Sequence, residues 1–133
     1  MIDAGVGLSV GEDAYLVGAN AAQDALERLK GKRAGAALVF ASVAYDQEKM
    51  LAGVRSVFPA AIVVGCSTAG EITTDGPAKR HSVAVMALAG EDIAFFAGVG
   101  ENIAANAREA GKQAAESIKK QVPNQTLDAF MML

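Results

Sequence analysis

The sequence is poor in residues that mark several large classes of protein. It has one cysteine, no tryptophan and only three prolines among its 133 residues. A single cysteine excludes an internal disulfide, so a reducing, cytoplasmic setting is expected. No apolar run approaches the ~18 residues that a membrane-spanning helix needs. No basic region followed by an apolar segment marks a secretory signal at the start of the chain.

An excess of charge of one sign is also lacking. The chain has 12 Lys and Arg against 15 Asp and Glu, for a net charge of −3. The basic residues form no stripe, and no aromatic platform is evident, with no tryptophan and only two tyrosines, so the sequence does not favour a nucleic-acid surface. The length suits one domain, and 52% hydrophobic residues is ordinary for a protein with a packed core.

Apolar periodicity predicts an α/β fold with a mixed β-sheet and flanking helices. Residues 36–41 and 61–64 are continuous apolar runs, typical of strands covered on both faces, and residues 5–10 form a thinner strand. Asp13 and Asp46 are placed to cap helices after the first two strands. Strand, helix and strand then form a βαβ unit with parallel strands. The apolar residues of the first helix at helical spacing predict its buried face: Leu16, Ala19, Ala22, Leu26 and Leu29.

The second half of the chain predicts an antiparallel hairpin, a third helix and a last strand. Residues 82–88 and 93–98 flank a turn and should pair as the hairpin. The third helix should start at Asn102 and end at Pro123-Asn124. Residues 127–133 have a strand pattern that stops without a turn, so we expect one domain over 1–133, cut in its last strand. We identify no internal repeat.

One stretch, Ile62 to Ile72, gathers small and polar residues at the end of an apolar strand. Gly65 and Gly70 let another group approach the main chain. In open α/β sheets, ligands bind at the carboxyl ends of strands, and this end should lie beside Ser42, where the other strand of the βαβ unit stops. Hydroxyls and backbone N–H groups here suit a carboxylate, and Glu71 suits an ammonium group. The predicted ligand-binding residues are Ser42, Gly65, Cys66, Ser67, Thr68, Ala69, Gly70 and Glu71.

Known chemical motifs do not match this stretch. Glu71 stands where a phosphate loop needs lysine, and Ala69 stands where a nucleophile elbow needs glycine. Cys66 could act as a nucleophile with His81, the only histidine, but a single pair in one loop is a weak signal. Cys66, Glu71 and His81 do not have the spacing of a known metal-binding motif. We therefore expect no catalytic residue, no metal and no cofactor.

The stretch Val64-Gly65-Cys66-Ser67-Thr68-Ala69-Gly70-Glu71-Ile72 closely resembles the N-terminal region of FIST domains. The resemblance extends over nearly the whole chain, through Ala4–Ser9, Leu38–Ser42, Tyr45-Asp46, Leu51, Asp75-Gly76 and Ser82–Met86. FIST domains are sensory domains of signalling proteins, and the family pairs this region with a C-terminal domain.

The resemblance implies a cytoplasmic small-ligand sensing module for signal transduction, with amino acids or similar polar metabolites as ligands. The implied partners are the C-terminal FIST domain and downstream signalling proteins, with neither nucleic acid nor membrane. The apolar end at Phe130–Leu133 also predicts self-association through an open strand edge. The alternatives are a thiol-dependent hydrolase or transferase that uses Cys66, and a pure protein-interaction domain.

Overall fold

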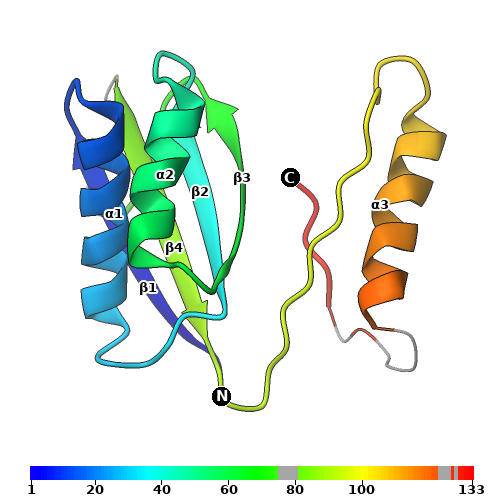
Figure 1. Cartoon of the computed structure of the whole chain (residues 1–133), viewed down its shortest axis with the longest axis horizontal. Coiled ribbons are helices and arrows are strands. Elements are labelled where there is room, and N and C mark those ends of the chain that lie inside the picture. The colour runs from blue at the N-terminus through cyan, green and yellow to red at the C-terminus, as the bar shows by residue number, and fades with distance from the viewer. Residues whose placement is uncertain (75–80, 123–126, 128) are drawn as a thin grey trace. The chain divides into compact units, whose positions relative to one another are not determined.

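A computed structural model describes residues 1–74, 81–122, 127 and 129–133 of the chain. The chain forms two compact units, residues 1–94 and residues 95–133. The elements of the first unit, in order, are β1 (Asp3–Val10), α1 (Ala14–Arg28), β2 (Ala36–Ser42), α2 (Gln47–Val57), β3 (Ile62–Thr68) and β4 (Ser82–Ala89) (Figure 1). The mixed α/β fold expected from the sequence is confirmed.

The four strands form one sheet in the order β1-β4-β2-β3. β2 and β3 are parallel, as the βαβ pattern predicts, and β4 is antiparallel to both β1 and β2. Ser42 is paired with Thr68, and Val10 is paired with Ser82. The carboxyl ends of β1, β2 and β3 and the start of β4 therefore lie along one edge, which we call the carboxyl edge.

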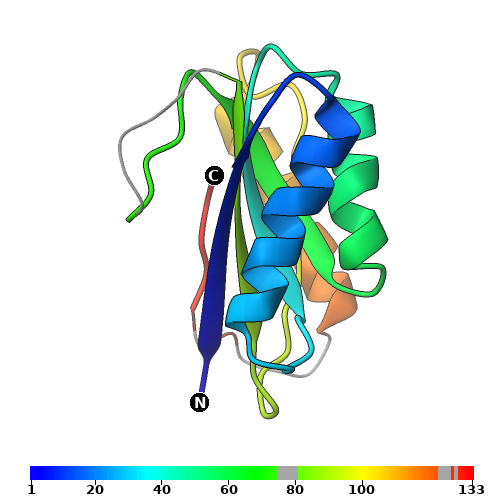
Figure 2. The same cartoon turned by 90° about the vertical axis from the view of Figure 1, so that its left-hand side faces the viewer.

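Helices α1 and α2 cover the same face of this sheet (Figure 2). Asp13 and Asp46 are their N-caps, as predicted, and each side chain accepts a hydrogen bond from the backbone three residues on. Helix α1 buries small residues: Val17, Gly18, Ala21, Ala22 and Ala25. The expected leucine-based face was wrong in part, because Leu16 is 55% exposed.

The reason is the close approach of α1 to β1. A Cβ atom added to Gly7 would lie only 2.0 Å from the carbonyl oxygen of Ala21, and one added to Gly5 would lie 2.1 Å from that of Ala25. The helix backbone thus rests directly on the strand, and only small side chains fit between them. The two helices approach each other in the same way, since a Cβ at Gly18 would lie 2.3 Å from the Met50 oxygen and one at Gly53 would lie 2.1 Å from the Tyr15 oxygen.

The predicted hairpin between residues 82–88 and 93–98 does not form. β4 pairs with β1 on one side and β2 on the other, so neither edge of β4 is left for the following segment. Residues 93–98 carry no strand and lead instead into the second unit. The sequence showed two neighbouring strand patterns, but the positions of β1 and β2 beside β4 are set by the whole sheet.

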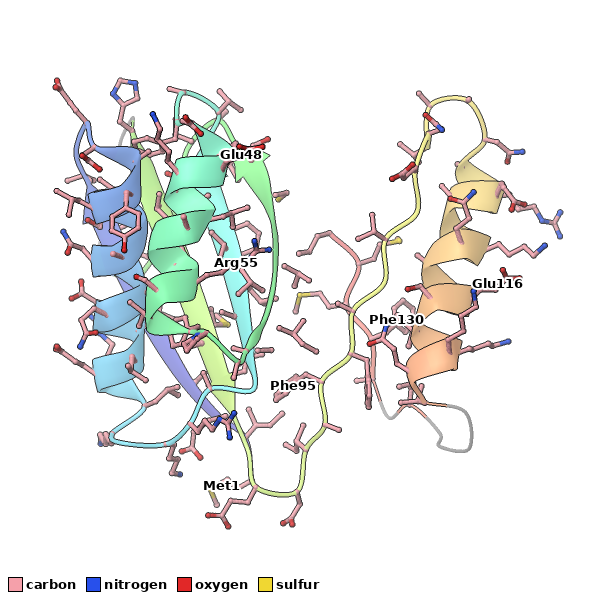
Figure 3. All side chains as sticks on the ribbon, viewed as in Figure 1. Met1, Glu48, Arg55, Phe95, Glu116 and Phe130 are labelled. Atoms are coloured by element: carbon pink, nitrogen blue, oxygen red, sulfur yellow. The ribbon has the colours of Figure 1, made fainter. Side chains whose placement is uncertain are left out.

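The second unit holds α3 (Ala107–Gln121), which begins at the N-cap Asn106, four residues later than predicted. Asn102 instead has a positive φ of 58° in the preceding loop. Glu116 lies on the solvent side of α3, where it pairs with Lys112 at 3.8 Å (Figure 3). Residues 129–133 form no strand, so the last predicted strand is not formed in its described part. The turn expected at Asp75-Gly76 and the helix end expected at Pro123-Asn124 lie outside the described residues. No described helix has the length and hydropathy needed to cross a membrane.

Candidate functional site

The carboxyl edge brings together polar residues from three loops and one strand start. Ser42 ends β2 and Thr68 ends β3, and the two are directly paired across the sheet. The backbone N–H of Val43 continues this pairing by donating to the Thr68 oxygen at 3.2 Å. Ser82 begins β4 at the same edge and is fully buried. The strand order thus places Ser42 beside the loop that follows β3.

Glu71 is the acidic group at the centre of this edge. Its side chain is only 4% exposed, although it lies three residues beyond the end of β3. One carboxylate oxygen accepts a hydrogen bond from the Thr68 hydroxyl, and the other accepts one from the Ser82 hydroxyl. Two neutral donors from different strands therefore hold the carboxylate in place.

Tyr45 ties the loops after β1 and β2 to the start of β4. Its hydroxyl shares its proton between the backbone oxygen of Gly11, at 2.7 Å, and the backbone oxygen of His81. The Tyr45 and His81 rings lie 6.1 Å apart between centroids, with their planes tilted by 52°. Burial raises the pKa of the Tyr45 hydroxyl, and the nearby negative charge of Glu71 raises it as well. Tyr45 is therefore a neutral hydrogen-bond donor at physiological pH.

A small cavity of about 170 Å³ opens beside this tyrosine. It is lined by Glu12, Ala44, Tyr45 and His81, which come from the loops after β1 and β2 and from the residue before β4. Its walls carry a carboxylate, a phenol ring and an imidazole. The volume suits a group of a few non-hydrogen atoms rather than a whole cofactor.

The sequence missed Tyr45, Ser82 and Glu12 as members of this site. Tyr45 lies three residues after the end of β2, so a polar residue just beyond a predicted strand was a usable signal. Ser82 and Glu12 could not be found in that way, because their place depends on β4 lying antiparallel beside β1.

The remaining predicted site residues lie at the outer margin of the site. Gly65, Cys66, Ser67 and Ala69 are exposed, and Gly70 is half-buried. Gly65 has a packing role, because a Cβ there would lie 1.8 Å from the Val39 oxygen of β2. Cys66 is a free, exposed thiol on β3. Within the described part of the chain, no three His, Cys, Asp or Glu side chains group as a metal site would require.

A larger cavity of about 670 Å³ lies at the opposite edge of the sheet, where β1 and β2 begin. Its lining includes Asp3, Lys32 and Glu91, and the first two form an ion pair. It lies at the end of the parallel strands where ligands seldom bind. The smaller cavity beside Tyr45 is the better candidate, because it lies at the carboxyl edge, where the buried side chains of Tyr45, Glu71 and Ser82 are found.

Tyr45 predicts a pH dependence of stability. Its pKa is raised above the usual 10.0 in the folded chain. The folded state therefore holds the phenol proton more tightly than the unfolded state does. The resulting stability is fully present below about pH 10 and is lost as the pH rises through the folded pKa. Unfolding in urea between about pH 8 and pH 11 should show this loss in wild type and not in Tyr45→Phe.

Tyr15→Phe is the matched control, because Tyr15 is the only other tyrosine and is 43% exposed. It should keep the wild-type pH dependence. An identical loss of stability in Tyr45→Phe and wild type would show that the raised pKa makes no contribution.

No curated protein matches the chain. A solved structure of an FtsZ mutant from M. jannaschii matches with 23% identity and a TM-score of 0.40; the match covers 66% of this chain and 27% of that chain. The sequence model of the FIST N domain matches residues 35–133, which include β2, β3, β4 and the Gly65 to Glu71 loop. The chain therefore belongs to the FIST N domain family.

Proposed function

We propose that this FIST N domain is a sensing module for signal transduction, and not an enzyme, and that it binds a small polar metabolite at the carboxyl edge. Glu71 is the observation that carries the proposal. A glutamate that is 4% exposed, at the edge where three strands end, is held by hydroxyls of two strands. Burial of a carboxylate is costly unless it is paired and hydrogen-bonded, and a cationic group of a ligand would supply that pairing.

Amino acids are the first ligand class to test. The carboxylate of Glu71 can accept hydrogen bonds from an ammonium group. Backbone N–H groups near Gly70 can donate to a carboxylate. An ammonium and a carboxylate on one carbon atom would engage both Glu71 and this backbone. Family membership supports the sensory role, since FIST domains are sensory domains of signalling proteins.

Thermal unfolding in the presence of a ligand panel tests the proposal. The panel contains the common amino acids, their amides, which lack the carboxylate, and the matching keto acids, which lack the ammonium. A ligand at one hundred times its Kd stabilises the folded state by about 2.7 kcal/mol. We expect stabilisation by one or a few amino acids and by neither group of analogues.

Calorimetric titration of each hit then gives its Kd and stoichiometry. If the amides stabilise the chain as well as the parent amino acids do, a carboxylate is not recognised. If no compound of the panel changes the unfolding temperature, the amino-acid proposal is refuted.

A further inference from the structure

The helices α1 and α3 have the same length, and their cap residues stand at corresponding positions. Each contains 15 residues. The N-caps are Asp13 and Asn106, and the C-caps are Leu29 and Val122, so that the two helices are offset by 93 residues throughout. Each N-cap side chain accepts a hydrogen bond from the backbone N–H three residues later.

The same offset aligns the sequences that precede and form these helices. Ala4-Gly5-Val6-Gly7 corresponds to Ala97-Gly98-Val99-Gly100 without a difference. Within the helices, alanine or glycine recurs at four corresponding pairs: Ala14 and Ala107, Gly18 and Gly111, Ala21 and Ala114, and Ala22 and Ala115. Over residues 97–133, nine of 37 positions are identical to residues 4–40.

The repeated glycines also make the same kind of contact with their helix. A Cβ at Gly98 would lie 2.3 Å from the Ala114 oxygen, and one at Gly100 would lie 1.8 Å from the Ala110 oxygen. In the first unit, a Cβ at Gly5 or Gly7 would meet the oxygen of Ala25 or Ala21. The counterparts of Ala25 and Ala21 are Ile118 and Ala114, so the contacts in the second unit lie one turn nearer the start of the helix. In both units, a step of two residues forward along the extended segment moves the contact about one turn backward along the helix. The extended segment therefore runs antiparallel to its helix. Figure 1 shows the segment before α3 running extended beside it.

We propose that residues 97–133 are a second copy of the β1-α1-β2 unit. The copy contains an extended segment, a capped helix and, at residues 129–133, the counterpart of residues 36–40. The repeat escapes a reading of the sequence because most of the shared residues are alanine and glycine, which are common in any chain. Their shared close contacts give the match its meaning, since glycine in an extended segment is otherwise unfavourable.

The second copy keeps the two glycines of the extended segment, but it lacks the acidic residue that lines the cavity beside Tyr45. Gly11 and Glu12, which follow β1 at the carboxyl edge, correspond to Ala104 and Ala105. Glu12 lines the cavity beside Tyr45, so the second copy has no counterpart to that wall. If the proposed ligand site is correct, this loop of the second copy contributes scaffold and not a second binding site.

A transplant tests the duplication without reference to any ligand. Residues 97–122 of the full chain are replaced by the sequence of residues 4–29, which has the same length. Hydrogen exchange of the helix amides is then compared with that of α3 in wild type. We expect protection factors within about tenfold of the wild-type values, because the transplanted segment brings its own segment-to-helix packing.

The matched control is the same transplant with valine in place of both glycines of its Ala-Gly-Val-Gly sequence, and its helix amides should lose their protection. A smaller replacement, in which the sequence of residues 8–13 takes the place of residues 101–106, should leave the amides at the start of α3 protected from hydrogen exchange. The proposal is overturned if the transplanted helix exchanges as fast as its valine control, or if both exchanges precipitate while wild type stays soluble at the same concentration.

Discussion

Glu71→Gln is expected to weaken binding of the sensed ligand by about 2–5 kcal/mol, which is the usual cost of removing one partner of a desolvated charge pair. The side chain keeps its shape and loses its negative charge. Because Thr68 and Ser82 hold the carboxylate through hydroxyls, which can also accept hydrogen bonds, the amide can stay in the same position. Calorimetric titration of the hits from the ligand panel measures the loss.

Glu91→Gln is the matched control for this experiment. Glu91 is an exposed glutamate that lines the larger cavity at the opposite edge of the sheet, and its substitution should leave the Kd unchanged. Circular dichroism of both variants checks the fold, and Thr68→Val gives a second test because it removes one of the hydroxyls that position Glu71. If ligands bind and neither Glu71→Gln nor Thr68→Val changes their affinity, Glu71 has no part in recognition.

Gly18→Ala and Gly53→Ala are each expected to destabilise the first unit by about 1–3 kcal/mol, the usual cost of overpacking. Helix propensity alone predicts the opposite, because alanine favours a helix over glycine by about 1 kcal/mol. Packing should dominate, since each new Cβ would meet a backbone oxygen of the other helix, at 2.3 Å from Met50 and 2.1 Å from Tyr15. Backbone atoms cannot move aside as a flexible side chain can.

Gly111→Ala is the control for these two variants. Gly111 is the counterpart of Gly18 in α3, and among the described residues no atom beyond its own stretch of helix lies within 4 Å of the position its Cβ would take. There the propensity gain should appear as slower hydrogen exchange of α3. Urea unfolding followed by circular dichroism serves for the first unit, because the chain has no tryptophan. Stabilisation by Gly18→Ala would show that α1 and α2 do not approach as closely as the structure indicates.

The sequence by itself determined the local elements and one long-range pairing. Asp13 and Asp46 were found as N-caps because a short acidic side chain before an apolar periodic stretch has a specific partner in the first turn. The parallel pairing of β2 and β3 followed from chain connectivity, since a strand, a helix and a strand joined by short links have one favoured arrangement. That arrangement also predicts Ser42 near the stretch from Gly65 to Glu71, and the structure pairs Ser42 with Thr68.

Only the tertiary structure decided where β4 lies, which face α1 buries and which residues surround Glu71. β4 lies between β1 and β2, and nothing in its own residues distinguishes that place from a hairpin with residues 93–98. The buried face of α1 follows from Gly5 and Gly7 on another element, which leave room for alanine and turn Leu16 outward. Ser82 reaches the carboxyl edge because of the antiparallel register of β4. The common physical reason is that local preferences fix how a segment folds, whereas the strand beside it and the helix above it are chosen by the packing of the whole unit.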